Sequence, residues 1–341
     1  MKLIRKILLP FSLLYWLVTA VRNFLYDIGF LKSQQFSVPV IAIGNLSTGG
    51  TGKSPQTEYL IRLLKDNYRL ATLSRGYKRK SEGYVLADVN ANADILGDEP
   101  YQFYSKFPDV NVAVDANRVN GIDNLLQLNP SPEVIVLDDA YQHRKVKAGF
   151  YILLTAYGDI YADDYLLPAG NLREGRSGAK RADVIVVTKC PADITEAEQQ
   201  KIKKKLRPQP EQKVYFTAIE YDTVVYGDNS EISTKEVKEK DKVLVAGIAK
   251  PKPFFDQLKN SSDVCLTYPD HHDFSAKDID DILAAAKDRV VVTTEKDYVR
   301  LKDKMPAQKL FYLPIKTSFI TNGDDFNKTV LNYVGKSTAN G

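Results

Sequence analysis

The chain has 341 residues, enough for two domains, and its charged and apolar fractions of 26% and 44% are ordinary for a globular protein. Its net charge of +4 is too small to indicate a nucleic-acid partner, so none is expected. The two cysteines, Cys190 and Cys265, lie far apart without metal-site spacing, which excludes a disulfide framework and favours a reducing compartment.

Residues 1–32 are predicted to form a helix at a membrane interface. Residues 7–21 carry no charge, which falls short of the ~20 apolar residues that span a bilayer. Tyr15 and Trp16 stand together, as interfacial anchors often do. We expect the helix to lie in the membrane surface, with Lys2, Arg5 and Lys6 meeting anionic headgroups. A helix packed on the protein's own core is the alternative.

Residues 38–55 predict a buried strand, a phosphate-binding loop and the start of a helix. Glycines let backbone N–H groups curl around phosphate oxygens, Lys53 is expected to reach the β- and γ-phosphates, and the Ser54 hydroxyl is expected to bind Mg²⁺. An ordinary glycine-rich turn is the alternative, since Ser47 replaces the usual first glycine. The expected nucleotide-binding residues are Ser47, Thr48, Gly49, Gly50, Thr51, Gly52, Lys53 and Ser54.

Short apolar runs alternate with helix-like stretches through the rest of the chain. This pattern predicts an α/β fold of the P-loop type, with a parallel sheet sandwiched by helices and ligands at the carboxyl ends of the strands. We assign residues 33–206 to this domain. A Pro-rich stretch follows, and residues 207–341 are expected to form a second, smaller α/β domain that closes over the site. The expected strands are 38–43, 70–74, 111–114, 134–137, 151–155 and 184–188, then 243–246 and 290–293.

Two pairs of acids are candidates for chemistry. Asp138 and Asp139 end an apolar strand, where a P-loop enzyme needs an acid to hold Mg²⁺ opposite the loop hydroxyl; a polar turn is the alternative. Asp98 and Glu99 precede Pro100, which by itself favours a helix cap. The other interpretation of Asp98 is a base that takes the proton of an attacking hydroxyl.

Basic residues and histidines provide further candidates. Arg173 lies in a loop rich in Gly and Arg and could stabilise a transferring phosphoryl group, while Glu174 could contact the metal. Arg75 and Arg118 fall near strand ends and could hold substrate phosphate; surface salt bridges are the alternative. His271 and His272 are adjacent, and from spacing alone the pair is more typical of an exposed loop than of a proton-transfer site.

The sequence favours ATP over GTP as the nucleotide. Guanine-specific proteins carry an Asn/Thr-Lys-x-Asp loop. Here Thr188-Lys189-Cys190-Pro191 lacks the Asp, and Thr294-Glu295-Lys296-Asp297 has the wrong order.

In their joint order, these motifs resemble the tetraacyldisaccharide 4'-kinase family, the lipid A kinases of Gram-negative bacteria. The resemblance extends to about residue 315. One departure is Ala140, where the family usually has Gly after the two acids. The motifs are Gly44-Asn45, residues 49–55, Ser74-Arg75-Gly76-Tyr77, Gly97-Asp98-Glu99-Pro100, Asp138-Asp139 with Gln142-His143, Pro168-Ala169-Gly170 with Leu172-Arg173-Glu174, Val187-Thr188-Lys189, residues 246–251 and Asp270-His271.

The resemblance implies transfer of the ATP γ-phosphate to the 4'-hydroxyl of a tetraacylated glucosamine disaccharide 1-phosphate, forming lipid IVA, with Mg²⁺ as cofactor. It implies that Asp98 is the base, paired with His271. It also places Asp138 and Asp139 near the metal and brings Arg173 and Glu174 into the site.

The resemblance further implies an acylated lipid partner and a location on the cytoplasmic face of the bacterial inner membrane, peripheral or monotopic. We expect Arg75, Arg118, His143 and Asn171 to contact the substrate. The alternative activity is a membrane-associated P-loop ATPase of the partner-switching type, without a lipid acceptor. The oligomeric state is left open.

Overall fold

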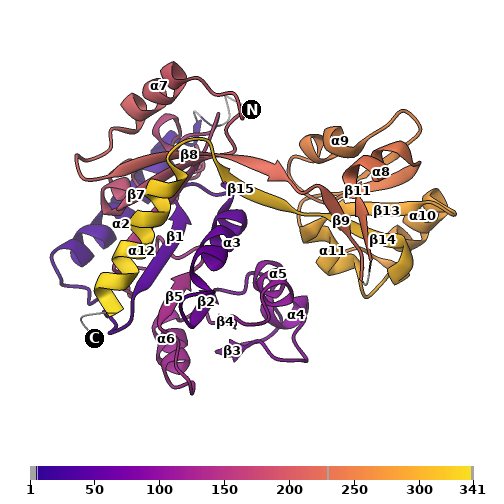
Figure 1. Cartoon of the computed structure of the whole chain (residues 1–341). Coiled ribbons are helices and arrows are strands. Elements are labelled where there is room, and N and C mark those ends of the chain that lie inside the picture. The colour runs from indigo at the N-terminus through magenta and orange to yellow at the C-terminus, as the bar shows by residue number, and fades with distance from the viewer. Residues whose placement is uncertain (1–4, 6, 229, 339–341) are drawn as a thin grey trace.

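The computed structural model describes residues 5, 7–228 and 230–338, and it contains two α/β bodies, each built on its own sheet (Figure 1). The larger sheet has nine strands in the order β15-β8-β7-β6-β1-β5-β2-β4-β3. The strands from β8 to β4 run parallel, and the edge strands β15 and β3 are antiparallel to their neighbours. The strands are β1 (Val40–Asn45), β2 (Leu70–Ser74), β3 (Val85–Leu86), β4 (Asn111–Val114), β5 (Val134–Leu137), β6 (Phe150–Ala156), β7 (Val184–Thr188), β8 (Lys213–Tyr221) and β15 (Ile315–Phe319).

Helices cover both faces of the larger sheet. The apolar sides of α3, α5 and α12 share one core with β1, β5 and β6, and α6 packs against the opposite face. Strands buried on both faces explain the uninterrupted apolar runs of the sequence. The helices of this body are α2 (Leu9–Asp27), α3 (Lys53–Leu64), α4 (Ala93–Leu96), α5 (Asp98–Lys106), α6 (Arg118–Leu126), α7 (Glu196–Leu206) and α12 (Gly323–Thr338), with the 3₁₀ turns η1 (Tyr161–Asp163) and η2 (Arg176–Arg181).

The smaller body contains a six-stranded sheet in the order β10-β9-β14-β13-β11-β12, parallel from β14 to β12. Its strands are β9 (Val224–Tyr226), β10 (Glu231–Ser233), β11 (Lys242–Ala246), β12 (Val264–Thr267), β13 (Val290–Thr294) and β14 (Leu310–Leu313). Its helices are α8 (Thr234–Glu239), α9 (Lys252–Leu258), α10 (Ala276–Ala286) and α11 (Glu295–Leu301), with the 3₁₀ turn η3 (Ala307–Lys309).

The predicted α/β fold class is confirmed, but the division at residues 206/207 does not match the sheet topology. β8, β15 and α12 belong to the larger body, so the chain leaves that body after β8 and returns to it at β15 (Figure 1). The smaller body therefore comprises roughly residues 222–314. The Pro-rich stretch connects α7 to β8 within one domain. The return depends on a pairing between β8 and β15 that is distant in sequence, which local composition does not reveal.

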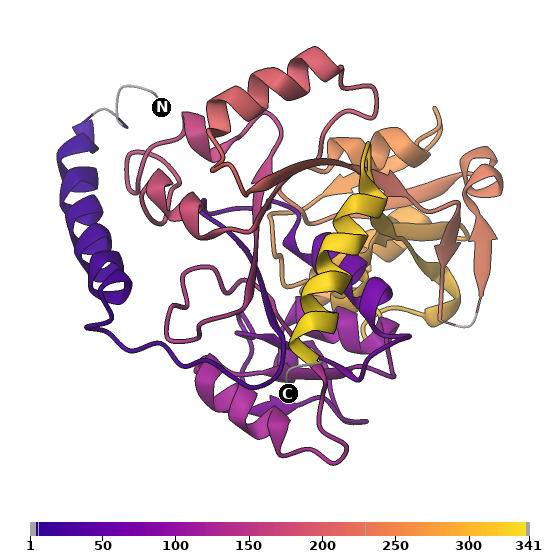
Figure 2. The same cartoon turned by 60° about the vertical axis from the view of Figure 1, so that its left-hand side comes forward.

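Helix α2 lies along the outside of the larger body (Figure 2). Ser12 is its one buried residue, so its apolar side is not packed into a core of the protein. Among the residues the structure describes, no helix is long and apolar enough to cross a membrane.

Candidate active site

The loop between β1 and α3 is held in place by contacts on both sides. Gly49 and Gly52 have φ values of 114° and 83°, a backbone region that favours glycine. The Thr48 N–H donates to the Asn171 carbonyl at 2.7 Å. From the other side, the Thr188 hydroxyl donates to the Thr51 carbonyl at 2.7 Å. The loop is thereby fixed just before the N-terminus of α3, where backbone N–H groups favour an anion.

Asp139 lies between two cations at the carboxyl edge of the sheet. Its carboxylate is 3.8 Å from Lys53 Nζ and 3.0 Å from Arg173 Nη2. Burial acts to raise the pKa of Asp139, but the charges of Lys53 and Arg173 outweigh it and lower that pKa. Asp139 also takes the left-handed conformation of the turn, with φ of 48°, so Ala140 does not need the freedom of the family's glycine.

Asp138 is buried beside Asp139 and accepts a hydrogen bond of 3.0 Å from the Thr57 hydroxyl. Burial, followed by the charges of Asp139 and Glu99, raises the pKa of Asp138 to about 6. Two adjacent carboxylates offer the oxygen ligands that a hard dication prefers. Within the described residues, no three His, Cys, Asp or Glu side chains gather as a metal site. Mg²⁺ is usually held by one or two carboxylates together with substrate phosphates, and Asp138 and Asp139 offer such carboxylates.

Glu174 does not lie with these acids. Its carboxylate accepts from Asn23 at 2.7 Å and from Gln142 at 3.0 Å, and it pairs with Arg181 at 2.8 Å. With only 3% of its surface exposed, Glu174 ties helix α2 to the loop before η2. The structure therefore gives Glu174 a different set of partners from the expected metal contact.

Arg75, Arg118 and His143 lie near one another and near Asp138, since the charges of Arg75 and Arg118 act on His143 and that of Asp138 acts on Arg118. We refer to the three as the basic group. Arg118 is 2% exposed, and its Nε has no hydrogen-bond partner among the described residues. Burial lowers the pKa of Arg118 to about 10, although Asp138 and Asp139 act to raise it. Burial and the charge of Arg118 lower the pKa of His143 to about 4, so this imidazole is neutral near pH 7. Asn171 lies apart from the group, against the P-loop, where its carbonyl accepts from Thr48.

Asp98 begins α5, and its main partners come from the smaller body. Arg300 of α11 donates to both carboxylate oxygens, from Nε to Oδ1 at 3.1 Å and from Nη2 to Oδ2. His271 Nδ1 lies 3.4 Å from Asp98 Oδ2. Burial acts to raise the pKa of Asp98, but the hydrogen bonds from His271 and Arg300 hold it well below its usual range.

His271 is itself held in place by the smaller body. Its φ is 58°, and its N–H donates to the Gly247 carbonyl at 3.2 Å. Lys296 Nζ, which can only donate, lies 3.1 Å from His271 Nε2. A neutral imidazole has one acceptor nitrogen. Arg300 Nη2, which also can only donate, lies 2.9 Å from Nδ1, closer than Asp98 Oδ2, so Lys296 and Arg300 compete for the single acceptor of the neutral ring.

The comparisons agree with this geometry. The profile of the family described as tetraacyldisaccharide-1-P 4'-kinase matches residues 4–335. The chain belongs to this family. A tetraacyldisaccharide 4'-kinase of Flavobacterium johnsoniae is 62% identical over 98% of both chains, and one of Bacteroides thetaiotaomicron is 46% identical over 99% of this chain and 95% of the relative. The crystal structure of the Aquifex aeolicus family member LpxK, in complex with ATP, superposes with a TM-score of 0.78 at 33% identity, covering 97% of this chain and 99% of that one.

The family predicted from the sequence is confirmed, and with it the kinase is favoured over the partner-switching ATPase. For this tetraacyldisaccharide 4'-kinase family member, however, sequence reasoning missed Arg300 and Lys296. The segment around them was considered only as a failed guanine motif. A better signal was available: Thr294 ends a strand and caps α11 through Asp297, so the segment is another strand-to-helix junction at a sheet edge.

Proposed function

We propose that the chain transfers the γ-phosphate of ATP to the 4'-hydroxyl of a tetraacylated glucosamine disaccharide 1-phosphate. The observation that carries the proposal is that two functional groups adjoin at one sheet edge. Lys53, Asp138 and Asp139 form a phosphate and metal side. Asp98 with His271 forms a proton-accepting side. The two sides are close enough that the charge of Glu99, next to Asp98, acts on Asp138.

On the donor side, the P-loop N–H groups and Lys53 would hold the ATP phosphates, while Ser54, Asp138 and Asp139 would hold Mg²⁺. Bound Mg²⁺ supplies neutralisation of the charge on the β- and γ-phosphates. Lys53 and Arg173 add positive charge where the transferring group becomes more negative. Loop contacts from Asn171 and Thr188 keep this arrangement fixed before substrate arrives.

On the acceptor side, Asp98 accepts the proton of the sugar hydroxyl as that oxygen bonds to the γ-phosphorus and the bond to the ADP oxygen breaks. His271 Nδ1 lies 3.4 Å from Asp98 Oδ2, where the imidazole can orient the carboxylate, and Lys296 and Arg300 hold the ring in place. The two hydrogen bonds from the Arg300 guanidinium, here called the Arg300 fork, hold Asp98 ionised in the free enzyme. Because a fully engaged carboxylate is a weak base, binding of the acceptor has to loosen part of this fork.

The basic group of Arg75, Arg118 and His143 is proposed to bind the polar part of the acceptor. The unpartnered Nε of Arg118 and Nε2 of His143 are buried polar atoms without a partner among the described residues, and such atoms are costly unless a ligand satisfies them. Guanidinium groups match a phosphate such as the acceptor's 1-phosphate.

Helix α2 is proposed to hold the enzyme on the bilayer that carries the acceptor, on the cytoplasmic face where ATP is present. Its polar residues face the protein: Tyr15 OH donates to the Arg173 carbonyl at 2.9 Å, and Arg22 Nη2 donates to the Gln142 carbonyl at 2.8 Å. All but three of the exposed large apolar side chains among the described residues lie at 7–30; the three are Tyr77, Val89 and Tyr165. A helix with its polar side chains toward the protein and its apolar side chains outward suits burial in a membrane interface.

The activity is tested by incubating the enzyme with [γ-³²P]ATP, Mg²⁺ and the disaccharide 1-phosphate lipid in neutral detergent. We expect label on the lipid, and we expect Asp98→Asn to lose about 10²–10⁴-fold of that transfer while keeping its fold. Label released only as inorganic phosphate would support an ATPase instead and contradict the proposal.

Membrane binding is tested by sedimentation with phosphatidylcholine vesicles. The variant Leu14→Glu/Val18→Glu changes two side chains of α2 that are 62% and 61% exposed. We expect it to remain in the supernatant while the wild type sediments. Val89→Glu, at a residue that is 93% exposed elsewhere on the surface, is a control for an apolar-to-acidic change and should sediment like the wild type. Equal sedimentation of all three would exclude α2 as the anchor.

A further inference from the structure

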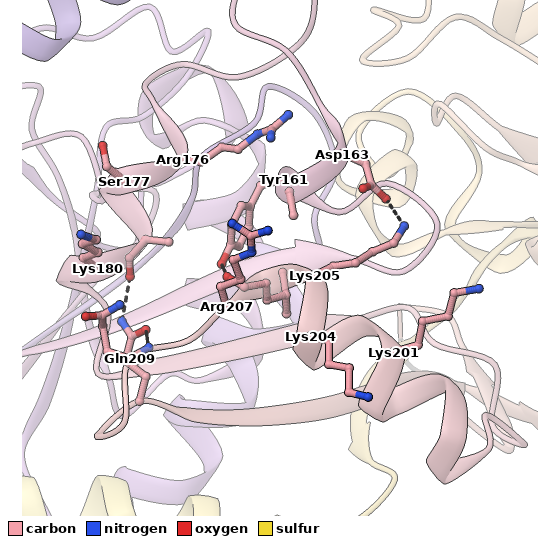
Figure 3. A pocket seen from close by; sticks show the side chains of 14 residues that line it. Tyr161, Asp163, Arg176, Ser177, Lys180, Lys201, Lys204, Lys205, Arg207 and Gln209 are labelled. Atoms are coloured by element: carbon pink, nitrogen blue, oxygen red, sulfur yellow. Dashed lines mark hydrogen bonds and ion pairs between the residues drawn. The ribbon is translucent and has the colours of Figure 1, made fainter.

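A hollow with a volume of about 650 Å³ lies outside the proposed catalytic edge, between η2 and the C-terminal end of α7. Figure 3 shows basic side chains from η2 on one side of it and from α7 on the other. We refer to it as the basic groove. Its six cationic side chains are Arg176, Lys180, Lys201, Lys204, Lys205 and Arg207.

The basic groove has a large surplus of positive charge. Asp163 is the one acid among its lining residues, and it is taken by Lys205 at 2.6 Å. No ion pair within the described residues involves Lys180, Lys201 or Lys204. Cations on the last turns of α7 also complement its helix dipole, and Arg176 Nη2 donates to the Asp164 carbonyl at 2.8 Å, but neither contact accounts for Lys180 on η2. Like charges gathered in this way favour an anionic ligand.

The floor of the basic groove is a fixed part of the fold. Tyr161 is 2% exposed, and its hydroxyl donates to the Leu206 carbonyl at 3.4 Å. The Gln212 side-chain amide donates to the carbonyls of Ala179 and Ala182 at 2.8 and 2.6 Å. These bonds join η1, η2 and the segment after α7. The cationic side chains therefore extend from segments that are fixed relative to one another.

The basic groove is continuous with the surface that carries helix α2. The segment between η1 and η2 lies between α2 and α7 (Figure 2). The Ser12 hydroxyl donates to the Leu166 carbonyl at 3.0 Å, and the Ala169 N–H donates back to it at 3.0 Å. A Cβ added at Gly175 would lie 3.5 Å from Trp16 Nε1, and Arg176, the next residue, already lines the groove. An anionic surface that met α2 would therefore be close to these cations.

We infer that the basic groove binds the phosphate headgroups of anionic phospholipids in the same bilayer that receives α2. This inference rests on the proposed membrane role of α2 and adds a second, electrostatic contact to it. Apolar insertion and a basic cluster together form the two-signal anchoring that makes peripheral attachment stable. The basic groove then fixes the rotation of the enzyme about α2, so that the catalytic edge keeps one orientation toward the membrane.

The test uses the variant Lys180→Gln/Lys201→Gln/Lys204→Gln and sedimentation with two kinds of vesicle, phosphatidylcholine alone and phosphatidylcholine with phosphatidylglycerol. Since each lysine near an anionic surface contributes about five-fold in partitioning, the variant should bind the anionic vesicles roughly 100-fold more weakly than the wild type. It should bind the neutral vesicles like the wild type. Raising the salt concentration to about 0.5 M should remove most of the difference.

The control variant Lys235→Gln/Lys238→Gln/Lys277→Gln makes the same change in net charge on exposed lysines of the smaller body. It should bind both kinds of vesicle like the wild type. Both lysine variants should keep wild-type phosphoryl transfer in neutral detergent, because none of these residues belongs to the proposed catalytic edge.

Equal binding of anionic vesicles by the wild type and the groove variant would overturn the inference while leaving α2 as the anchor. An equal loss in the control variant would also overturn it, because net charge alone would then explain the binding. Lysine-dependent binding of free inorganic phosphate, with unchanged vesicle binding, would assign the basic groove to a soluble anion. Failure of the wild type to bind any vesicle would reject the proposed role of α2 itself.

Discussion

The donor and acceptor sides of the proposed site are built in different ways. Lys53, Asp139 and Arg173 all belong to the larger body, and the loop that carries Lys53 is continuous with its strand and helix. The acceptor side is divided: Asp98 belongs to the larger body, whereas His271, Lys296 and Arg300 belong to the smaller one. The donor side is therefore complete within one body, and the acceptor side exists only where the two bodies meet.

Further ion pairs reinforce that junction. Lys296 pairs with Glu99 at 3.0 Å, and Lys106 pairs with both Glu58 and Glu295 at 2.7 and 2.5 Å. The bodies are joined covalently through the connections that follow β8 and precede β15 (Figure 1). Docking of α11 on α5 thus brings together the residues of the proposed proton acceptor, so closure of the two bodies would be coupled to proton transfer.

The largest expected effect comes from breaking the donor side. Lys53→Ala removes a cation beside Asp139 and from the position proposed for the ATP phosphates, and we expect phosphoryl transfer to fall on the order of 10³-fold. The contacts of Asp98 lie elsewhere and should be unaffected. Phosphoryl transfer to the lipid measures the loss of activity, and a thermal melt checks that the variant keeps its fold. A variant with near-normal turnover would remove Lys53 from the account.

Breaking the acceptor side across the junction should have a smaller effect. Arg300→Gln loses the fork that positions Asp98, and misplacement of this kind costs about 10²-fold in kcat. The pKa of Asp98 should rise without the guanidinium, so the acid limb of the pH–rate profile should move to higher pH. Arg300→Lys, which keeps the charge but not the fork, should recover the acid limb more than it recovers kcat. An unchanged pH profile in Arg300→Gln would show that Arg300 has only a structural role.

Glu174 tests how far the donor side extends. Because its buried carboxylate pairs with Arg181, Glu174→Gln should lower the free energy of unfolding by about 3 kcal/mol. The Mg²⁺ concentration for half-maximal activity should stay the same, since Glu174 lies with Arg181 and not with Asp138. A raised Mg²⁺ requirement at unchanged stability would restore the metal role expected from the sequence.

The smallest expected effect is a pH-dependent change in stability that comes from Glu295, at the junction of the two bodies. Burial and the neighbouring Glu58 raise the pKa of Glu295 to about 7. An acid whose pKa is raised on folding loses stability as pH rises from its unfolded value toward its folded value. We therefore compare the free energy of unfolding of Glu295→Gln with that of the wild type by urea unfolding at pH 5.5 and pH 8. The difference should shift in favour of the variant by about 1–2 kcal/mol at the higher pH. A stability difference that is the same at both pH values would contradict a raised pKa for Glu295.

The donor side could be predicted from the sequence because it is local. A strand, a glycine loop and a helix start are consecutive in the chain, and Asp138 ends a strand in a recognisable way. The fold class follows from the same alternation of strands and helices. These features need no knowledge of how distant segments meet.

The acceptor side could not be predicted in this way. Spacing alone favoured a helix cap for Asp98 and an exposed loop for His271, and only the family resemblance paired them. Arg300 lies 202 positions from its partner Asp98, a contact that depends on how two bodies dock. The domain boundary failed for a similar reason, since the pairing of β8 with β15 joins segments that are about 100 residues apart.

The central claim is that Asp98 and His271 act as one unit assembled across the junction. It is tested most directly by kcat for lipid phosphorylation in Asp98→Asn, His271→Gln and the double variant. Residues that act together are not additive, so the double variant should be about as slow as the slower single variant. A double variant slowed by the product of the two single effects would show independent roles and contradict the account.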